Sequence, residues 1–362
     1  MVSSDCKIGI IGAGSSGIYL AILLAQQGYR VDLFEKSPSP RTDGCGILLI
    51  SQGLQVLRQG NRQLCQKIVD SGIQVSQYEF RNLKGKLVNS QSPQYSAGQM
   101  PNVLIHRKAI LETLLEFLPQ NCLHLNAQCQ AIAQTEDGVT VNFSDGTQWQ
   151  GDLLVGADGL FSQVRESVVP DVKPFYLGDL VWRGVVADDT FCTDGNFIVY
   201  VRGRGIYANF FDLGHGLTHW GFFIEQEKDR QERSHDIPIP PQELAKLPIE
   251  PRTVIESTPP EQMVTRYSYD IDTLPRLHRG RILLIGDAAH AKSPTRARGM
   301  TSGLEDSFAL SQFLASSSDI PAALTSFETE RKPIVHEYQR TSRQQSLTIG
   351  RRHKRTAHIA NT

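Results

Sequence analysis

The hydrophobic and polar positions of residues 7–35 predict a strand, a helix and a second strand. The run KIGIIG has the length and apolar composition of a buried strand, and AGSSG is typical of a turn. IYLAILLAQQG continues as an apolar helix that Gly28 would end, and YRVDLFE follows as the next strand. Because strands joined by one helix lie parallel with a right-handed crossover, the pattern predicts the start of a parallel sheet.

Beyond this unit the pattern changes twice. DLLVGADG predicts a further strand that enters a glycine turn, and GRILLIGDAAH repeats this pattern of apolar residues and glycine late in the chain. Between them, residues 172–274 alternate aromatic and polar positions, which predicts an antiparallel sheet. The sequence therefore predicts an α/β domain that a β-rich insertion interrupts. Helices are also expected at 46–70, 107–118, near 228–262 and at 303–350, and strands at 123–134 and 138–146.

Composition and charge narrow the class of protein. The 362 residues carry a formal net charge of −1, which gives no reason to expect nucleic acid as a partner. Six cysteines lie apart, without CxxC spacing or a histidine cluster, so we expect no metal and a reducing compartment, the cytoplasm. The longest apolar runs are too short to span a bilayer, and no signal peptide fits before the first strand.

The turn after the first strand carries the dinucleotide-binding fingerprint G-x-G-x-x-G. Its first glycine permits the turn, its second lets a pyrophosphate approach the backbone, and its third lets helix and strand pack closely. The phosphates would lie at the helix N-terminus, where unpaired N–H groups favour anions. Glu35 ends the second strand, where a carboxylate accepts hydrogen bonds from ribose hydroxyls. The expected cofactor contacts in the turn are Gly12, Ala13, Gly14, Ser15, Ser16 and Gly17.

Three further stretches, RTDGCGI, GADGLFSQVR and GDAAHAKSP, follow the fingerprint in order. With them the chain resembles the FAD-dependent class A flavoprotein monooxygenases, the p-hydroxybenzoate hydroxylase-like aromatic hydroxylases. The resemblance covers nearly the whole chain, including VWRGVV and FETERKPIV. It implies FAD as cofactor, NADH or NADPH as electron donor, and hydroxylation of a small aromatic molecule with O₂ through a flavin C4a-hydroperoxide. We expect a monomer or homodimer without stable membrane insertion.

The resemblance also implies roles for residues around the nucleotide. Glu35, with Lys36 beside it, would hold the adenosine ribose, and Cys129 would contact adenine through its backbone. Arg41 and Arg107 would reach the cofactor phosphates or the nicotinamide donor, because a guanidinium suits phosphate bidentately. For Arg107 the alternative is a plain position on a helix surface.

Other residues are assigned to the flavin end of the cofactor. The resemblance implies that Asp158 supports both FAD and NAD(P)H binding, although an aspartate before Gly159 is also a common turn residue. Asp287 would bind the ribityl chain, and the residues from Pro294 onward would wrap the isoalloxazine. His290 is expected to be a packing residue of the same motif.

The flavin loop departs from the family pattern P-x-x-G-x-G, which a small residue and asparagine usually follow. Ala297 replaces the first glycine, and a positive φ there would cost about 1 kcal/mol. We hypothesise that Arg298 tunes or gates the flavin, since a guanidinium near N1 would favour its reduced anion. Three alternatives stay open for the two arginines: they impede nicotinamide docking, recognise an acidic substrate or point to solvent. The loop is Pro294, Thr295, Arg296, Ala297, Arg298, Gly299, Met300 and Thr301.

Candidates for acid–base chemistry come from the aromatic strands. Hydroxylation of an electron-rich ring is helped by deprotonation of a phenol or amine, so a His or Tyr is expected. Alternation places Tyr207, Asn209 and Phe211 on one face of their strand and Ala208 and Phe210 on the other. For each such residue, a place in the core or at the rim is the plain alternative. The catalytic candidates are Arg183, which would contact substrate or flavin, Tyr207 and His215, with Tyr200 and His219 as further positions.

The predicted architecture is thus a Rossmann-like FAD-binding domain with a parallel sheet, interrupted by an antiparallel substrate domain and followed by helices. Two alternatives to NAD(P)H-dependent hydroxylation stay open at this point. One is an FAD enzyme with another outcome, such as epoxidation, oxidative decarboxylation or use of externally reduced flavin. The other is a non-catalytic FAD- or ligand-binding protein. The expected segments are the FAD-binding domain at 1–171 and 275–310, the substrate domain at 172–274, and C-terminal helices with a basic tail at 311–362.

Overall fold

The computed structural model describes residues 2–40, 44–201, 205–226 and 237–349. Its first elements are those that the hydrophobic pattern predicts: β1 (Lys7–Ile11), α1 (Ser15–Gln26) and β2 (Arg30–Phe34). β1 and β2 pair in parallel along their whole length. The predicted start of a parallel sheet is therefore confirmed.

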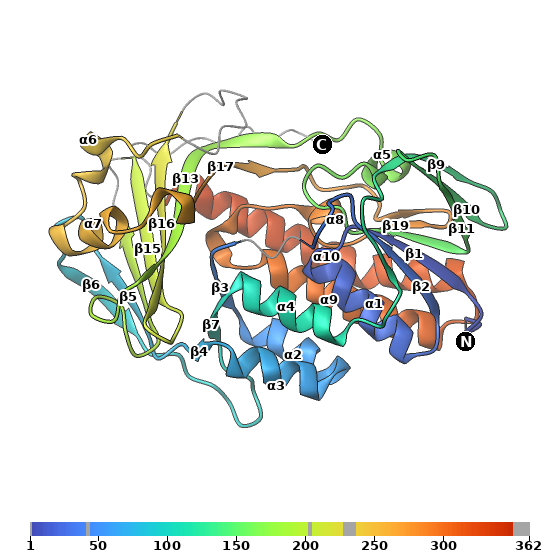
Figure 1. The fold of residues 1–362 in the computed structure, drawn as a ribbon, viewed down its shortest axis with the longest axis horizontal. Helices are drawn as coiled ribbons and strands as arrows, with labels where there is room; N and C mark the ends of the chain where they lie inside the picture. Colours follow the sequence, from blue (N-terminus) through green and yellow to red (C-terminus); the bar gives the residue numbers. More distant parts are fainter. Residues whose placement is uncertain (1, 41–43, 202–204, 227–236, 350–362) are drawn as a thin grey trace.

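β1 lies inside a six-stranded sheet of order β18-β19-β12-β1-β2-β8 (Figure 1). β12 (Leu153–Gly156) pairs in parallel with β1, and β19 (Ile282–Leu284) pairs in parallel with β12. The late strand thus returns to the sheet that begins at the N-terminus, as the repeated pattern predicts. The edge strands are short: β8 (Leu123–His124) is parallel to β2, and β18 (His278–Arg279) is antiparallel to β19.

One predicted helix, at 46–70, is wrong in part. Its first residues form β3 (Gly46–Leu49), which pairs antiparallel with β7 (Val103–His106). The rest divides at Asn61, whose backbone is extended and whose side chain accepts a hydrogen bond from Leu64 N, capping the second helix. Other elements of this region are α2 (Ser51–Gly60), α3 (Arg62–Asp70), β4 (Ile73–Gln74), α4 (Arg107–Phe117), β9 (Cys129–Gln134), β10 (Val139–Phe143), β11 (Gln148–Gly151) and α5 (Val164–Val168).

The insertion forms a seven-stranded sheet of order β17-β13-β16-β15-β14-β5-β6. Its strands from 172 onward are antiparallel neighbours, as predicted. However, β5 (Gln77–Arg81) and β6 (Leu87–Gln91) come from the earlier stretch that we assigned to the FAD-binding domain, and β5 pairs in parallel with β14. The remaining strands are β13 (Phe175–Ala187), β14 (Asn196–Val201), β15 (Ile206–Asp212), β16 (Leu217–Glu225) and β17 (Met263–Asp270).

The two faces of this sheet differ as the alternation in β15 predicts. Ala208 and Phe210 are fully buried in a core that also contains Trp182 and Trp220. Three short helices belong to the segment that covers this face: α6 (Pro241–Leu244), α7 (Ile249–Glu256) and the 3₁₀ turn η1 (Pro260–Gln262). The opposite face, with Tyr207 and Asn209, is left for the FAD-binding side of the molecule.

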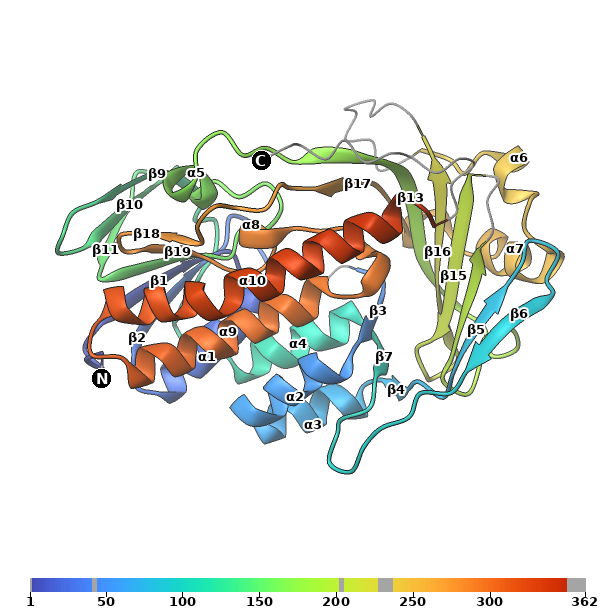
Figure 2. The same cartoon turned by 180° about the vertical axis from the view of Figure 1, so that it is seen from behind.

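Long C-terminal helices join the two sheets. Figure 2 shows α10 (Ile320–Ser346) running beside α9 (Gly299–Ser316) toward β13 and β17. Arg343 of α10 donates to Asp270 of β17 at 2.9 Å, which fixes that end. The basic tail lies outside the described residues. None of the described helices is long and apolar enough to cross a membrane.

Candidate active site

The turn between β1 and α1 has the geometry that the fingerprint requires. Gly12 has φ +106°, and a Cβ on Gly17 would lie 2.0 Å from the Gly12 carbonyl oxygen, so both positions exclude side chains. At Gly14, by contrast, no described atom lies within 4 Å of where a Cβ would stand. No described side chain caps the N-terminus of α1. This space in front of the helix fits a pyrophosphate.

Glu35 joins this turn to the end of β2. Its carboxylate accepts from Ala13 N at 3.1 Å and from Ser37 N at 3.0 Å. Because a carboxylate offers about four acceptor positions, capacity remains for ribose hydroxyls. Lys36 is exposed beside it, and Cys129 is buried at the start of β9. Burial and the charge of Asp158 raise the pKa of Cys129 to about 11, so its thiol is inert and only its backbone suits adenine.

Asp158 is occupied by local hydrogen bonds. It accepts from Ser162 Oγ at 2.6 Å, from Gln163 N at 2.7 Å and from Val164 N at 3.2 Å, and so caps the start of α5. Sequence reasoning assigned no role to Arg165, which lies in the same motif. Arg165 is buried and donates to the Ala288 carbonyl oxygen at 3.0 Å, which ties this motif to α8 (Asp287–His290).

The first and last FAD motifs meet at Ser16. A Cβ on Gly286 would lie 2.8 Å from Ser16 Oγ, and one on Gly303 would lie 2.0 Å from it. This close approach brings Asp287, which is exposed, to the same end of the sheet as the α1 turn. Arg41 lies outside the described residues. Arg107 begins α4, and its backbone N–H donates to the Cys45 carbonyl at 3.0 Å, so it borders the loop before β3.

The loop 294–301 adopts the strained geometry expected for it. The turn η2 (Pro294–Arg296) ends at Ala297, which has φ +52° and ψ +29°. Arg296 is exposed. Arg298 places its guanidinium over the ring of Tyr338, 4.7 Å from the centroid, and its Nη1 is buried without a partner among the described residues. The hypothesis that Arg298 tunes or gates the flavin stays a prediction. The other flavin contacts predicted in this loop remain predictions: Pro294, Gly299, Met300 and Thr301, the last of which is buried with Oγ1 unpaired in the described structure.

The free face of the large sheet gathers polar groups from neighbouring strands. Arg183 of β13 and Asn209 of β15 both lie opposite Gly221 of β16, so a residue without a side chain separates them. Arg183 has no ion pair among the described residues, and Asn209 Oδ1 is buried without a hydrogen-bond partner there. Asn209 Nδ2 donates to Tyr207 Oη at 3.3 Å. These groups are available to a ligand over Gly221.

His215 lies elsewhere. It is exposed in the turn between β15 and β16, with φ +56°, so the structure gives no support to His215 as a catalytic residue. A positive φ is uncommon outside glycine, but histidine is among the residues that adopt it more often. The conformation of the turn therefore accounts for His215. His219 is the histidine on the polar face: its Nδ1 accepts from Gly46 N at 3.0 Å, and its ring also hydrogen-bonds the backbone of Gly184. Burial and the nearby Arg183 lower the pKa of His219 well below its ordinary value.

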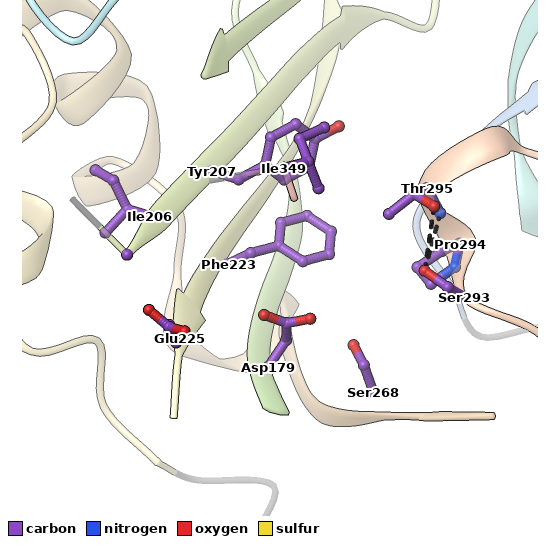
Figure 3. A pocket seen from close by; sticks show the side chains of 11 residues that line it. Asp179, Ile206, Tyr207, Phe223, Glu225, Ser268, Ser293, Pro294, Thr295 and Ile349 are labelled. Carbon is purple, nitrogen blue, oxygen red and sulfur yellow. Dashed lines mark hydrogen bonds between the residues drawn. The ribbon is translucent and has the colours of Figure 1, made fainter. Parts of the chain in front are cut away.

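A pocket lies between this face and the flavin loop. Figure 3 shows the rings of Tyr207 and Phe223 on one side and Ser293, Pro294 and Thr295 on the other. The pocket holds about 360 Å³, part of it open to solvent. In the described part of the chain, no group of acidic, histidine and cysteine side chains could hold a metal ion, and all six cysteines are free.

Comparisons with known proteins agree with this geometry. The family model "FAD binding domain" matches residues 5–342. The chain is 30% identical over 356 residues to 3-amino-4-hydroxybenzoate 2-monooxygenase of Streptomyces cremeus, covering 95% of this chain and 87% of that protein. It is 26% identical to salicylate hydroxylase of Pseudomonas putida over 374 residues, covering 93% and 83%. The structure of Klebsiella pneumoniae HpxO with FAD and uric acid has a TM-score of 0.83 at 24% identity, covering 94% and 88%.

A Rossmann-like sheet with an open glycine turn, joined to an antiparallel sheet over a pocket, defines an FAD-dependent oxidoreductase. The chain belongs to the FAD-binding-domain family, within the class A flavoprotein monooxygenases. It is an FAD-dependent monooxygenase of a family that hydroxylates small aromatic molecules.

Proposed function

We propose that this chain is an NAD(P)H-dependent hydroxylase that binds a small aromatic molecule between the large sheet and the flavin loop. The observation that supports this most directly is the pocket in which Tyr207 and Phe223 oppose Pro294. Aromatic walls with a few converging polar groups suit a flat ligand of this kind. FAD, when bound, supplies hydride acceptance and oxygen activation.

The residues that would hold FAD are spread along one end of the parallel sheet. The backbone around Gly14 would receive the pyrophosphate, and Glu35 the adenosine ribose. Asp287 would hold the ribityl chain, and Arg107 would lie beside the phosphates or the donor. The open space at Gly14, the exposed carboxylate of Asp287 and the unpaired Thr301 Oγ1 favour this placement.

The polar face over Gly221 would orient the substrate. Arg183 would pair with an ionised oxygen of the aromatic molecule, because it is a cation without an ion pair in the described structure. Burial raises the pKa of Tyr207, although Asn209 and Arg183 oppose the rise, so the phenol keeps its proton and donates at neutral pH. Relatives named for 3-amino-4-hydroxybenzoate and salicylate, both ionised aromatics, support this substrate class.

The test begins with the absorbance spectrum of the purified protein, which should be that of bound flavin. Oxidation of NADH and of NADPH is then measured with a panel of aromatic acids and amines. We expect at least one compound to stimulate oxidation and to be recovered with one added oxygen. Arg183→Met should raise KM for acids at least tenfold, whereas Arg276→Met, which removes an exposed arginine, should not. A colourless protein that takes up no FAD, or oxidation that no aromatic compound stimulates, would contradict the proposal.

A further inference from the structure

A buried lysine lies at the base of the flavin loop. Lys292 is 9% exposed, and its Nζ lies 2.9 Å from His290 Nδ1 and 3.0 Å from Ser302 Oγ. An ammonium group is costly to bury unless it is paired and hydrogen-bonded. Lys292 has one hydrogen-bond partner on either side, His290 and Ser302.

On one side, the hydrogen bonds lead to Asp306 of α9. His290 Nε2 lies 2.5 Å from Asp306 Oδ2, which also accepts from Gly286 N at 2.9 Å, while Arg331 donates to Oδ1 at 2.9 Å. Burial opposes ionisation of Asp306, but His290 and Arg331 outweigh it and hold its pKa well below the ordinary value. Because the carboxylate only accepts, His290 donates through Nε2 and accepts through Nδ1. Lys292 is therefore the donor to His290.

On the other side, the hydrogen bonds lead to the first turn of α9. Ser302 Oγ accepts from Lys292 and donates to the Gly299 carbonyl oxygen at 3.0 Å. Gly299 is the residue at which the flavin loop enters the helix. One continuous chain of hydrogen bonds thus runs from Asp306 through Lys292 to the backbone of the loop.

The pKa of Lys292 is lowered from its ordinary value. Burial lowers its pKa, and Arg331 acts in the same direction. Three carboxylates, those of Asp287, Asp306 and Asp270, act in the opposite direction. The carboxylates that oppose this fall in pKa lie at the end of β17, at the start of α8 and in α9.

We propose that Lys292 is a positioning residue for the flavin reaction, which fixes the first turn of α9 and places a buried positive charge behind the flavin loop. This inference relies on the proposed function only for the position of the flavin along loop 294–301. Reduced FAD carries more negative charge than oxidised FAD, so a fixed cation at this place favours the reduced form. The N-terminus of α9 acts in the same sense, and Lys292 keeps that helix end oriented.

The test compares variants at Lys292 in the absence of aromatic substrate and of NAD(P)H. Lys292→Met removes the charge and both hydrogen bonds, Lys292→Gln keeps a polar group without the charge, and Lys292→Arg keeps the charge. FAD affinity is measured by flavin fluorescence, and the midpoint potential of bound FAD by dye titration. We expect the Gln and Met variants to lose about tenfold in preference for reduced over oxidised FAD, equivalent to a potential about 30 mV more negative. The Arg variant should stay near the wild type.

Two controls separate positioning from general stability. Ser302→Ala breaks the link to Gly299 but keeps the ammonium, so FAD affinity should fall while the potential changes little. Lys332→Met removes an equal charge from α10, where Lys332 contacts Glu328, and should alter neither quantity. If the Met variant does not fold, the Gln and Arg variants still decide between charge and packing. Equal potentials in the Gln variant, the Arg variant and the wild type would overturn the inference, whether or not the protein proves to be a hydroxylase.

Discussion

Arg298 lies over the ring of Tyr338, with its guanidinium carbon 4.7 Å from the centre of the ring. The contact joins the N-terminus of α9 to the middle of α10. Beside it, Thr295 Oγ1 donates to the Ser342 carbonyl oxygen at 2.9 Å. Two side chains of the flavin loop therefore attach the loop to α10. The residues on both sides of Ala297, which replaces the first glycine of the family pattern, thus take part in attaching the loop to the helix.

This contact makes the loop's stability depend on Tyr338. Tyr338→Leu removes the aromatic face and should lower the free energy of unfolding by about 0.5–1 kcal/mol, the usual size of a partly exposed cation–π contact. Tyr338→Phe keeps that face and should leave stability nearly unchanged. Thermal unfolding of the apoprotein measures both. Equal losses in the two variants would show that the hydroxyl group, not the ring, matters.

Replacement of Ala297 by glycine should raise the free energy of unfolding of the protein. Its φ of +52° lies in the left-handed region, where an L side chain costs about 1 kcal/mol or more. Ala297→Gly should therefore raise the midpoint of denaturant unfolding. Ala245 provides the matched control, because it is exposed with φ −62° and the same substitution there should destabilise. A loss of stability in Ala297→Gly would mean that the alanine side chain packs favourably despite its backbone.

The fingerprint glycines should separate folding from cofactor binding. In Gly14→Ala the new methyl enters open space, so the apoprotein should unfold at the wild-type temperature but lose at least tenfold in FAD affinity. In Gly17→Ala the methyl would meet the Gly12 carbonyl oxygen, so folding itself should suffer. The flavin content of purified protein and the unfolding temperature of the apoprotein distinguish these effects. FAD binding unchanged in Gly14→Ala would contradict the placement of the pyrophosphate.

His219 should make stability depend on mild acid. An unfolded histidine has a pKa of about 6.5, and burial with Arg183 lowers the pKa of His219 well below this in the folded state. Above about pH 6.5 its contribution to stability is therefore complete, and it is lost as the pH falls toward the folded pKa. His219→Gln should make the fall in stability between pH 6.5 and 5 shallower, because one fewer group takes up a proton on unfolding. An unchanged slope in His219→Gln would show that the pKa of His219 is not lowered in the folded state.

Local patterns predicted the elements whose partners are close in sequence. The β1–α1–β2 unit and the alternation around Tyr207 depend on neighbouring residues, and both are confirmed. The break of the predicted helix at Asn61 was also visible in principle, since asparagine favours helix N-caps. Strand β3 could not be predicted in this way, because four residues such as GILL form a strand only where a partner strand, here β7, pairs with them.

In the candidate site, too, local motifs were predictable from the sequence and contacts between distant segments were not. The glycine turn and Glu35 follow from one short motif, whereas the meeting of Arg183 and Asn209 over Gly221 depends on the register of three strands. The direction of Arg298 depends on Tyr338, which lies forty positions later in another helix. The role proposed for Lys292 could not be predicted from the sequence, because it depends on hydrogen bonds that exist only once α9 is packed.

The pairing of β5 with β14 has a consequence for protein engineering. The substrate sheet is made from two stretches of chain, residues 77–91 and 175–270, and part of the cofactor-binding region lies between them. A chimera that borrows the substrate preference of a relative by exchanging only residues 175–270 would leave a donor strand β14 beside a recipient strand β5. Successful grafts must carry residues 77–91 as well, so specificity in this scaffold is inherited as a pair of segments and not as a single cassette.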